Sequence, residues 1–186
     1  MDYQLRNATE ADAPAISALI ARSIRALGRD DYTPAQIEAA LTGAFGLDTS
    51  LIRDGTYFVV VAAHGELAAC GGWGMRRTLF GSDTRAERDE ARLDPRIDAA
   101  KIRACFVDPR HTRRGLGRRI LEHSEAEAAR RGFVRFELMA TLPGRRLYEQ
   151  CGYRAQPPLD YPLPGGLSIR FVPMSKTIGP GAGASA

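Results

Sequence analysis

The stretch IRACFVDPRHTRRGLGRRILEHSEAEAARRG, residues 102–132, decides the fold of this chain. Residues 103–107 form a short, mostly apolar run that ends at Asp108-Pro109, which is typical of a buried strand. From Leu116 onward, apolar and small residues recur at helical spacing until Gly132, where a helix is expected to end. The turn between them is basic and contains glycine: Arg113, Arg114, Gly115, Gly117, Arg118 and Arg119. The stretch therefore predicts a strand, a basic turn and a helix.

The turn is a candidate site for an anion. The first N–H groups of a helix have no partner within the helix, and the helix dipole makes this end positive. Glycines where a helix begins leave these N–H groups accessible, and the arginines add charge. We therefore expect a phosphate-bearing ligand here. A purely structural turn is the alternative, but such a turn would not need the arginines.

Composition places the chain among globular proteins of one domain. It has 186 residues, of which 44% are hydrophobic and 26% charged. The net charge of +4 is too small to indicate nucleic-acid binding, so we expect no nucleic-acid partner. We expect one domain over residues 1–176 and a flexible C-terminal tail over residues 177–186, which is rich in small residues.

The sequence lacks the features of a secreted, membrane-spanning or metal-binding protein. The N-terminal MDYQLRNATEADAP has early acids and no apolar core typical of a signal peptide, and no 18-residue apolar run follows. We therefore expect a cytoplasmic protein with no membrane partner. The three cysteines are expected to be free thiols. The three histidines lack the spacing of metal ligands, so we expect no metal, and His123 is expected to face solvent.

The remaining elements alternate between strands and helices. Their expected ranges are strands at 3–6, 56–64, 67–75, 134–140 and 168–172, helices at 9–27, 33–43 and 144–151, a solvated loop at 80–101 and an irregular proline-rich run at 157–164. This order predicts a mixed α/β sheet with helices on both faces. The strand, helix and strand around the basic turn should form one parallel, right-handed βαβ unit. Trp73 fits either the core or a pocket wall.

Three kinds of phosphate ligand compete for the turn. A Walker A loop requires G-x-x-x-x-G-K-[ST], which has no match, and a dinucleotide fingerprint lacks its third glycine because Ile120 stands there. The segment from Thr112 to Gly117 resembles motif A of the GNAT superfamily of N-acetyltransferases, Q/R-x-x-G-x-G/A, with Thr112 where Gln or Arg is usual. A second landmark is similar: Tyr148 precedes the pair Gly152-Tyr153 by four residues. The resemblance covers about residues 3 to 176.

The resemblance implies the acyl-CoA N-acyltransferase fold, a mostly antiparallel central sheet with one parallel βαβ unit. It also implies an acetyl-CoA-dependent N-acetyltransferase that moves an acetyl group to a primary amine by direct attack. Phe106 and Val107 would flank the pantetheine, with the Val107 N–H as oxyanion donor, and Tyr148 would be the general acid toward the CoA thiolate. The pyrophosphate would lie on Arg113, Arg114, Gly115, Leu116, Gly117 and Arg118.

The sequence leaves open the general base, the role of Tyr148, the acceptor and the oligomeric state. Glu137, Glu66 or a chain of waters could act as the general base, and Tyr148 could instead be a core aromatic residue on an amphipathic helix. The acceptor amine is unidentified, although residues 32–41 and the 80–100 segment should border its pocket by analogy with the family. A homodimer is possible. A non-catalytic acyl-CoA-binding sensor and a nucleotide-binding module are the two alternative classes of function.

Overall fold

The computed structural model describes residues 2–84 and 89–179. One eight-stranded mixed sheet has the order β1-β2-β3-β4-β5-β8-β6, with β7 also paired to β8. The strands are β1 (Tyr3–Asn7), β2 (Tyr57–Ala62), β3 (Leu67–Gly74), β4 (Ala100–Val107), β5 (Arg135–Thr141), β6 (Arg154–Ala155), β7 (Leu159–Pro162) and β8 (Ser168–Thr177). The helices are α1 (Ala13–Leu27), α2 (Pro34–Ala40), α3 (Thr49–Arg53), α4 (Leu116–Arg130) and α5 (Arg145–Gln150), with short 3₁₀ turns at Glu10–Asp12, Pro109–His111 and Pro164–Gly166.

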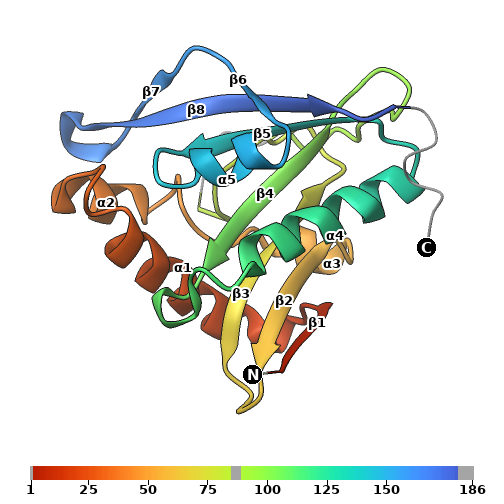
Figure 1. The fold of residues 1–186 in the computed structure, drawn as a ribbon. Helices are drawn as coiled ribbons and strands as arrows, with labels where there is room; N and C mark the ends of the chain where they lie inside the picture. The colour runs from red at the N-terminus through yellow and green to blue at the C-terminus, as the bar shows by residue number, and fades with distance from the viewer. Residues whose placement is uncertain (1, 85–88, 180–186) are drawn as a thin grey trace.

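Helices cover both faces of the sheet, as the sequence predicts (Figure 1). The residues of β2 form an unbroken apolar run because both faces of this strand are buried. Tyr57 and Val59 pack in the core on the face of α1 and α2, whereas Phe58 and Val60 pack in the core on the face of α4. A strand buried on both faces needs apolar residues at successive positions rather than at alternate ones. The two cores therefore share one central sheet.

The predicted βαβ unit is confirmed. The strands β4 and β5 are parallel and pair at Ala100↔Phe136 and Lys101↔Glu137, and α4 connects them. Beyond these two pairs the strands diverge, with β4 running away at an angle from β5 and β8 (Figure 1). Among the residues that the structure describes, the second half of β4 has no strand partner on that side, and this half forms the floor of the site.

A bulge accompanies the divergence. The register between β3 and β4 shifts between Cys70 and Gly72, and Ala104 of β4 has a φ of 47°. Gly71 lies opposite this irregularity, and a Cβ at this position would come within 2.7 Å of the Cys105 Sγ. An extra residue in one strand bends and twists that strand locally. Glycine at position 71 therefore lets β3 approach the bulged strand closely.

Some predicted boundaries are wrong, mostly near the C-terminus. The strand β8 continues to Thr177, five residues past the expected end, and its partner β7 lies within the supposedly irregular proline-rich run. Proline is tolerated here because β7 lies at an edge of the sheet and Pro162 is its last residue. The helix α3 is short and was not expected. Thr177 belongs to the sheet, and residues 180–186 of the predicted tail lie outside the described part of the chain.

Other side chains also depart from expectation. The segment 80–101 is not only a solvated loop, because Ala99 and Ala100 are buried and β4 begins at Ala100. His123 does not face solvent freely: its ring packs edge-on against Phe58 at 4.4 Å between centroids. Trp73 is fully buried and belongs to the core rather than to a pocket wall.

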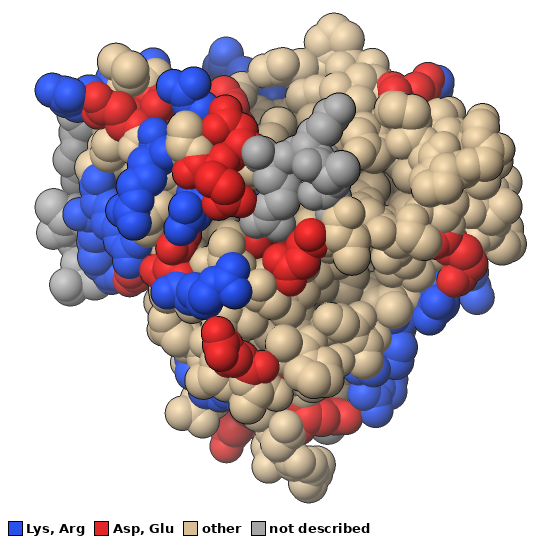
Figure 2. Space-filling view, turned by 180° about the vertical axis from the view of Figure 1, so that it is seen from behind, with Lys and Arg blue, Asp and Glu red and all other residues tan. Residues whose placement is uncertain are grey.

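The surface carries both charges close together. Viewed from behind, blue and red residues lie interspersed along the left side, and much of the right side is uncharged (Figure 2). Many of these charges form ion pairs at the surface, such as Arg96–Asp94 and Arg25–Glu38, each at 2.7 Å. Over the described ranges, no helix is both long and apolar enough to cross a membrane.

Candidate active site

A cavity of about 600 Å³ follows the divergence of β4 from β5. Its walls come from β4, from the turn and first residues of α4, from β5 and α5, and from the second half of α1, residues 44–46 and 80–81, and Phe171 of β8. Of the site residues predicted from sequence, the cavity brings together Phe106, Val107, Arg113, Gly115, Leu116, Gly117, Arg118 and Tyr148. Arg114 is exposed and is not among the residues that line it.

The turn has the backbone of an anion cradle. Arg113 and Gly115 both have positive φ, at 61° and 77°, so the chain turns sharply before α4. The N–H of Arg119 is the first to bond within the helix, to the Gly115 carbonyl at 3.0 Å. The N–H groups of residues 116–118 precede it, and an α-helix offers no acceptor for them. Since these residues also line the cavity, their N–H groups fit a phosphate-bearing ligand.

The unpaired edge of β4 offers a further donor. The Asp108 N–H donates to the Ala68 carbonyl of β3 at 2.9 Å, and Phe106 is paired with Cys70 of the same strand. Successive N–H groups of a strand point to opposite edges. The Val107 N–H is therefore directed away from β3, toward the side on which β4 and β5 separate.

Tyr148 is held on α5 at the wall of the cavity. Its side chain is 8% exposed, and its ring packs edge-on against Tyr153 at 5.9 Å between centroids. Burial raises the pKa of Tyr148 well above its usual value, and the neighbouring Cys105 raises it further. Burial likewise raises the pKa of Cys105 to about 12. Both groups therefore stay protonated near neutral pH.

The candidate bases named from sequence lie elsewhere. Glu137 is paired with the Lys101 Nζ at 2.6 Å, and Glu66 is hydrogen-bonded to the His111 Nε2 at 2.8 Å. Neither residue lines the cavity, although His111 does. Within the described ranges, no aspartate or glutamate lines the cavity at all. The same ranges hold no group of three or more His, Cys, Asp or Glu side chains able to bind a metal ion.

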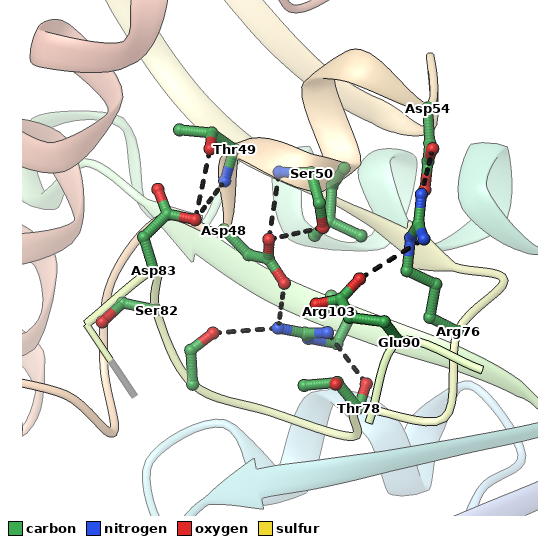
Figure 3. A network of polar contacts seen from close by, with 12 residues as sticks. Asp48, Thr49, Ser50, Asp54, Arg76, Thr78, Ser82, Asp83, Glu90 and Arg103 are labelled. Carbon is green, nitrogen blue, oxygen red and sulfur yellow. Dashed lines mark hydrogen bonds and ion pairs between the residues drawn. The ribbon is translucent and has the colours of Figure 1, made fainter. Parts of the chain in front are cut away.

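A buried ion pair at the cavity was not found from the sequence. Arg103 of β4 donates to the Asp48 Oδ2 at 2.9 Å, and the two side chains are 3% and 2% exposed (Figure 3). Arg103 also donates to the Thr78 and Gly81 carbonyls, at 2.8 and 2.9 Å. An arginine inside an otherwise apolar strand was the available signal, because such a charge requires a buried partner.

Comparison with known proteins identifies the family. The sequence model of the acetyltransferase (GNAT) family matches residues 22–153, which is more than half of the chain. The chain therefore belongs to the GNAT family of acetyltransferases, and the resemblance and fold class predicted from sequence are confirmed. A search of curated proteins finds no significant match.

Solved structures share the fold at low identity. A GCN5-related N-acetyltransferase from Rhodopseudomonas palustris is 18% identical, with a TM-score of 0.69 over 96% of this chain and 97% of that one. The PaiA N-acetyltransferase from Thermoplasma acidophilum, in complex with coenzyme A, is 12% identical, with a TM-score of 0.64 over 96% and 100%. YncA from Salmonella typhimurium, a putative acetyltransferase with acetyl-CoA, is 16% identical, with a TM-score of 0.63 over 100% and 99%.

Proposed function

We propose that this protein is an acetyl-CoA-dependent N-acetyltransferase, with residues 1–176 as its single catalytic domain. The observation that carries the proposal is the continuous cavity, which joins the N–H groups at the start of α4 to the open edge of β4 and to Tyr148. The bound coenzyme A of PaiA and the acetyl-CoA of YncA support this choice of donor. The free cysteines are consistent with a cytoplasmic location.

The donor would be held mainly by backbone groups. Arg113 and the residues from Gly115 to Arg118 would bind the pyrophosphate, with Arg114 contributing charge from the surface. Phe106 and Val107 would flank the pantetheine along the open edge of β4. The side chain at position 112, threonine here, is not needed for this binding because the N–H groups of the turn do not depend on it.

The chemistry needs no enzyme nucleophile. The amine would attack the thioester carbonyl directly, so that a C–N bond forms while the C–S bond breaks. The Val107 N–H would donate to the carbonyl oxygen as negative charge develops there. The raised pKa of Cys105 keeps its thiol protonated, which does not suit covalent catalysis.

Tyr148 would stabilise the departing thiolate. Its hydroxyl is protonated near neutral pH and can donate a hydrogen bond to the sulfur. Because a thiol has a pKa near about 8.5, complete proton transfer from Tyr148 is uphill, and the hydrogen bond itself supplies much of the stabilisation. The proton lost by the amine would leave through water, because no carboxylate of the described residues lines the cavity and both ring nitrogens of His111, which does, are engaged with Tyr3 and Glu66.

Ligand binding tests the donor. Thermal unfolding would be compared with and without acetyl-CoA, CoA, NAD or ATP. A ligand at about 100 times its Kd adds about 2.7 kcal/mol to stability, which for a domain of this size raises Tm by roughly 5–10 °C. We expect this shift for acetyl-CoA and CoA. A shift with NAD or ATP alone would support a nucleotide-binding module instead.

Turnover tests the role of Tyr148. Tyr148→Phe should lower kcat by about 10²–10³-fold, as is typical when one hydrogen-bond donor to the transition state is removed, while the affinity for CoA is nearly kept. Tyr153→Phe is the matched control, because it removes a buried hydroxyl from the adjacent ring without altering the cavity wall. Unchanged turnover of Tyr148→Phe would show that Tyr148 only packs in the core and takes no part in catalysis. Binding of acetyl-CoA without turnover of any amine would support a sensor.

A further inference from the structure

Four phenylalanines line one part of the cavity. They are Phe45, Phe80, Phe106 and Phe171, from four separate segments of the chain. The ring centroid of Phe45 lies 6.3 Å from that of Phe106 and 5.7 Å from that of Phe171, both nearly perpendicular. The Phe80 ring lies 5.5 Å from Phe171. We call these four residues the aromatic wall.

The aromatic wall lies on the other side of β4 from α4. The side chain of Phe106 packs with the core on the face of α1 and α2, whereas Val107 packs with the core on the face of α4. Phe45 and Phe171 are buried, but Phe80 and Phe106 are only half-buried and present ring surface to the cavity. This part of the cavity is separate from the turn that would bind pyrophosphate, and it adjoins the Val107 N–H through Phe106.

The segments that carry the aromatic wall are fastened to each other. Arg103 bonds the Thr78 and Gly81 carbonyls on either side of Phe80, and Asp48 neutralises its charge (Figure 3). The segment after Phe80 is tied in turn to the segment of Phe45. The Ser82 N–H donates to the Gly43 carbonyl at 2.9 Å, and the Asp83 N–H donates to the Leu47 carbonyl at 3.1 Å. The rings are therefore held in place before a ligand binds.

The charges around the cavity also restrict the acceptor. No carboxylate among the described residues lines the cavity, and its charged lining residues are arginines, of which Arg103 is paired with Asp48 and Arg118 lies 3.8 Å from Glu122. A polycation would enter this space without a counter-ion and would lose its hydration. An apolar ring would instead replace water on Phe80 and Phe106 and gain edge-to-face contacts.

We propose that the acceptor is a primary monoamine carried on an aromatic ring, with no second positive charge, and that its ring packs against the aromatic wall. This inference rests on the proposed acetyl transfer and names its substrate class. The ring would bind on Phe80 and Phe106, and its amine would reach the thioester beside the Val107 N–H. Arg103 acts as a positioning residue, because it holds the segment of Phe80 without contacting the amine.

A panel of amines tests the substrate class. CoA release from acetyl-CoA would be followed with 2-phenylethylamine, n-hexylamine, spermidine, kanamycin and an alanine-terminated peptide. We expect kcat/KM to be at least about tenfold higher for 2-phenylethylamine than for the polar amines, a difference of about 1.4 kcal/mol. Equal or faster turnover of spermidine, kanamycin or the peptide would overturn the inference while leaving acetyl transfer intact. No CoA release with any amine would overturn the proposed function and this inference with it.

Variants of Phe80 test the aromatic wall itself. Phe80→Ala should raise the KM for 2-phenylethylamine about tenfold with little change in the KM for acetyl-CoA. Phe80→Leu keeps an apolar side chain and removes only the ring, so it serves if Phe80→Ala folds poorly. Leu167→Ala is the matched control, because Leu167 is half-buried against the same core but does not line the cavity. The same KM in Phe80→Ala, Phe80→Leu and the control would contradict packing on the aromatic wall.

Discussion

The buried pair Arg103–Asp48 offers a quantitative test of how the site is held together. Arg103→Met would leave the Asp48 carboxylate buried without its guanidinium partner, while the N–H and hydroxyl of Ser50 still donate to it, at 3.0 and 2.6 Å. Removing one partner of a buried pair typically costs about 3–5 kcal/mol, because the other charge stays uncompensated. Asp48→Leu should cost a similar amount, because it removes the buried carboxylate that Arg103 contacts at 2.9 Å and the N-cap of α3.

The double variant should cost less than the two single variants together. Arg103→Met/Asp48→Leu leaves no buried charge at this position. Its remaining cost is the two carbonyls that lose their donor, at about 1 kcal/mol each, and the lost N-cap, at about 1 kcal/mol. We therefore expect a total near 3 kcal/mol and a coupling energy of at least about 2 kcal/mol in the double-mutant cycle.

Urea unfolding measures this cycle directly. Trp73, the only tryptophan of the chain, is fully buried and reports the loss of the core by its fluorescence. The control cycle is the exposed pair Arg25–Glu38, for which we expect no coupling beyond experimental error. Additive effects in the Arg103–Asp48 cycle, with coupling below about 0.5 kcal/mol, would refute the argument that the charges are mutually dependent.

Three further predictions concern Gly71 of β3, Asp108 just after β4, and the thiols. Gly71→Ala should destabilise the protein by about 1–3 kcal/mol in the same urea assay, because its Cβ would lie 2.7 Å from the Cys105 Sγ; an unchanged midpoint would contradict this. Burial alone would raise the pKa of Asp108, but hydrogen bonds from two arginines and a backbone N–H hold it well below its usual value. Its stabilising effect is therefore complete above the unfolded pKa of about 3.9 and is lost as the pH falls toward the folded value, so Asp108→Asn should lower stability at pH 7 and flatten its decline below about pH 4. Burial raises the pKa of Cys70 and Cys105 to about 12, so a thiol reagent at pH 8 should label Cys151 first, as mass spectrometry of the native protein can check; faster labelling of Cys70 would contradict the burial argument.

Local signals were sufficient for the turn and its helix. The glycines, the arginines and the helical spacing after Leu116 all lie within one short stretch, and the structure begins α4 at Leu116. The strand β2 was equally clear, because burial on both faces leaves an unbroken run of apolar residues in the sequence. The strand β7 was missed because Pro162 and the prolines on either side of the strand outweighed a pattern of only four residues.

The part of the cavity that we propose for the acceptor could not be predicted from the sequence. The aromatic wall joins residues 45, 80, 106 and 171, and the pair Arg103–Asp48 joins positions 55 residues apart. Such contacts leave no local periodicity, because they are selected by the packing of the whole sheet rather than by neighbours along the chain. The sequence by itself determined the basic turn and the helix N-terminus at which we propose that the donor binds, since a helix N-terminus is a property of a few consecutive residues. Only the tertiary structure decided which side chains lie across the cavity from the start of α4, because the divergence of β4 from β5 brings distant residues to one cavity.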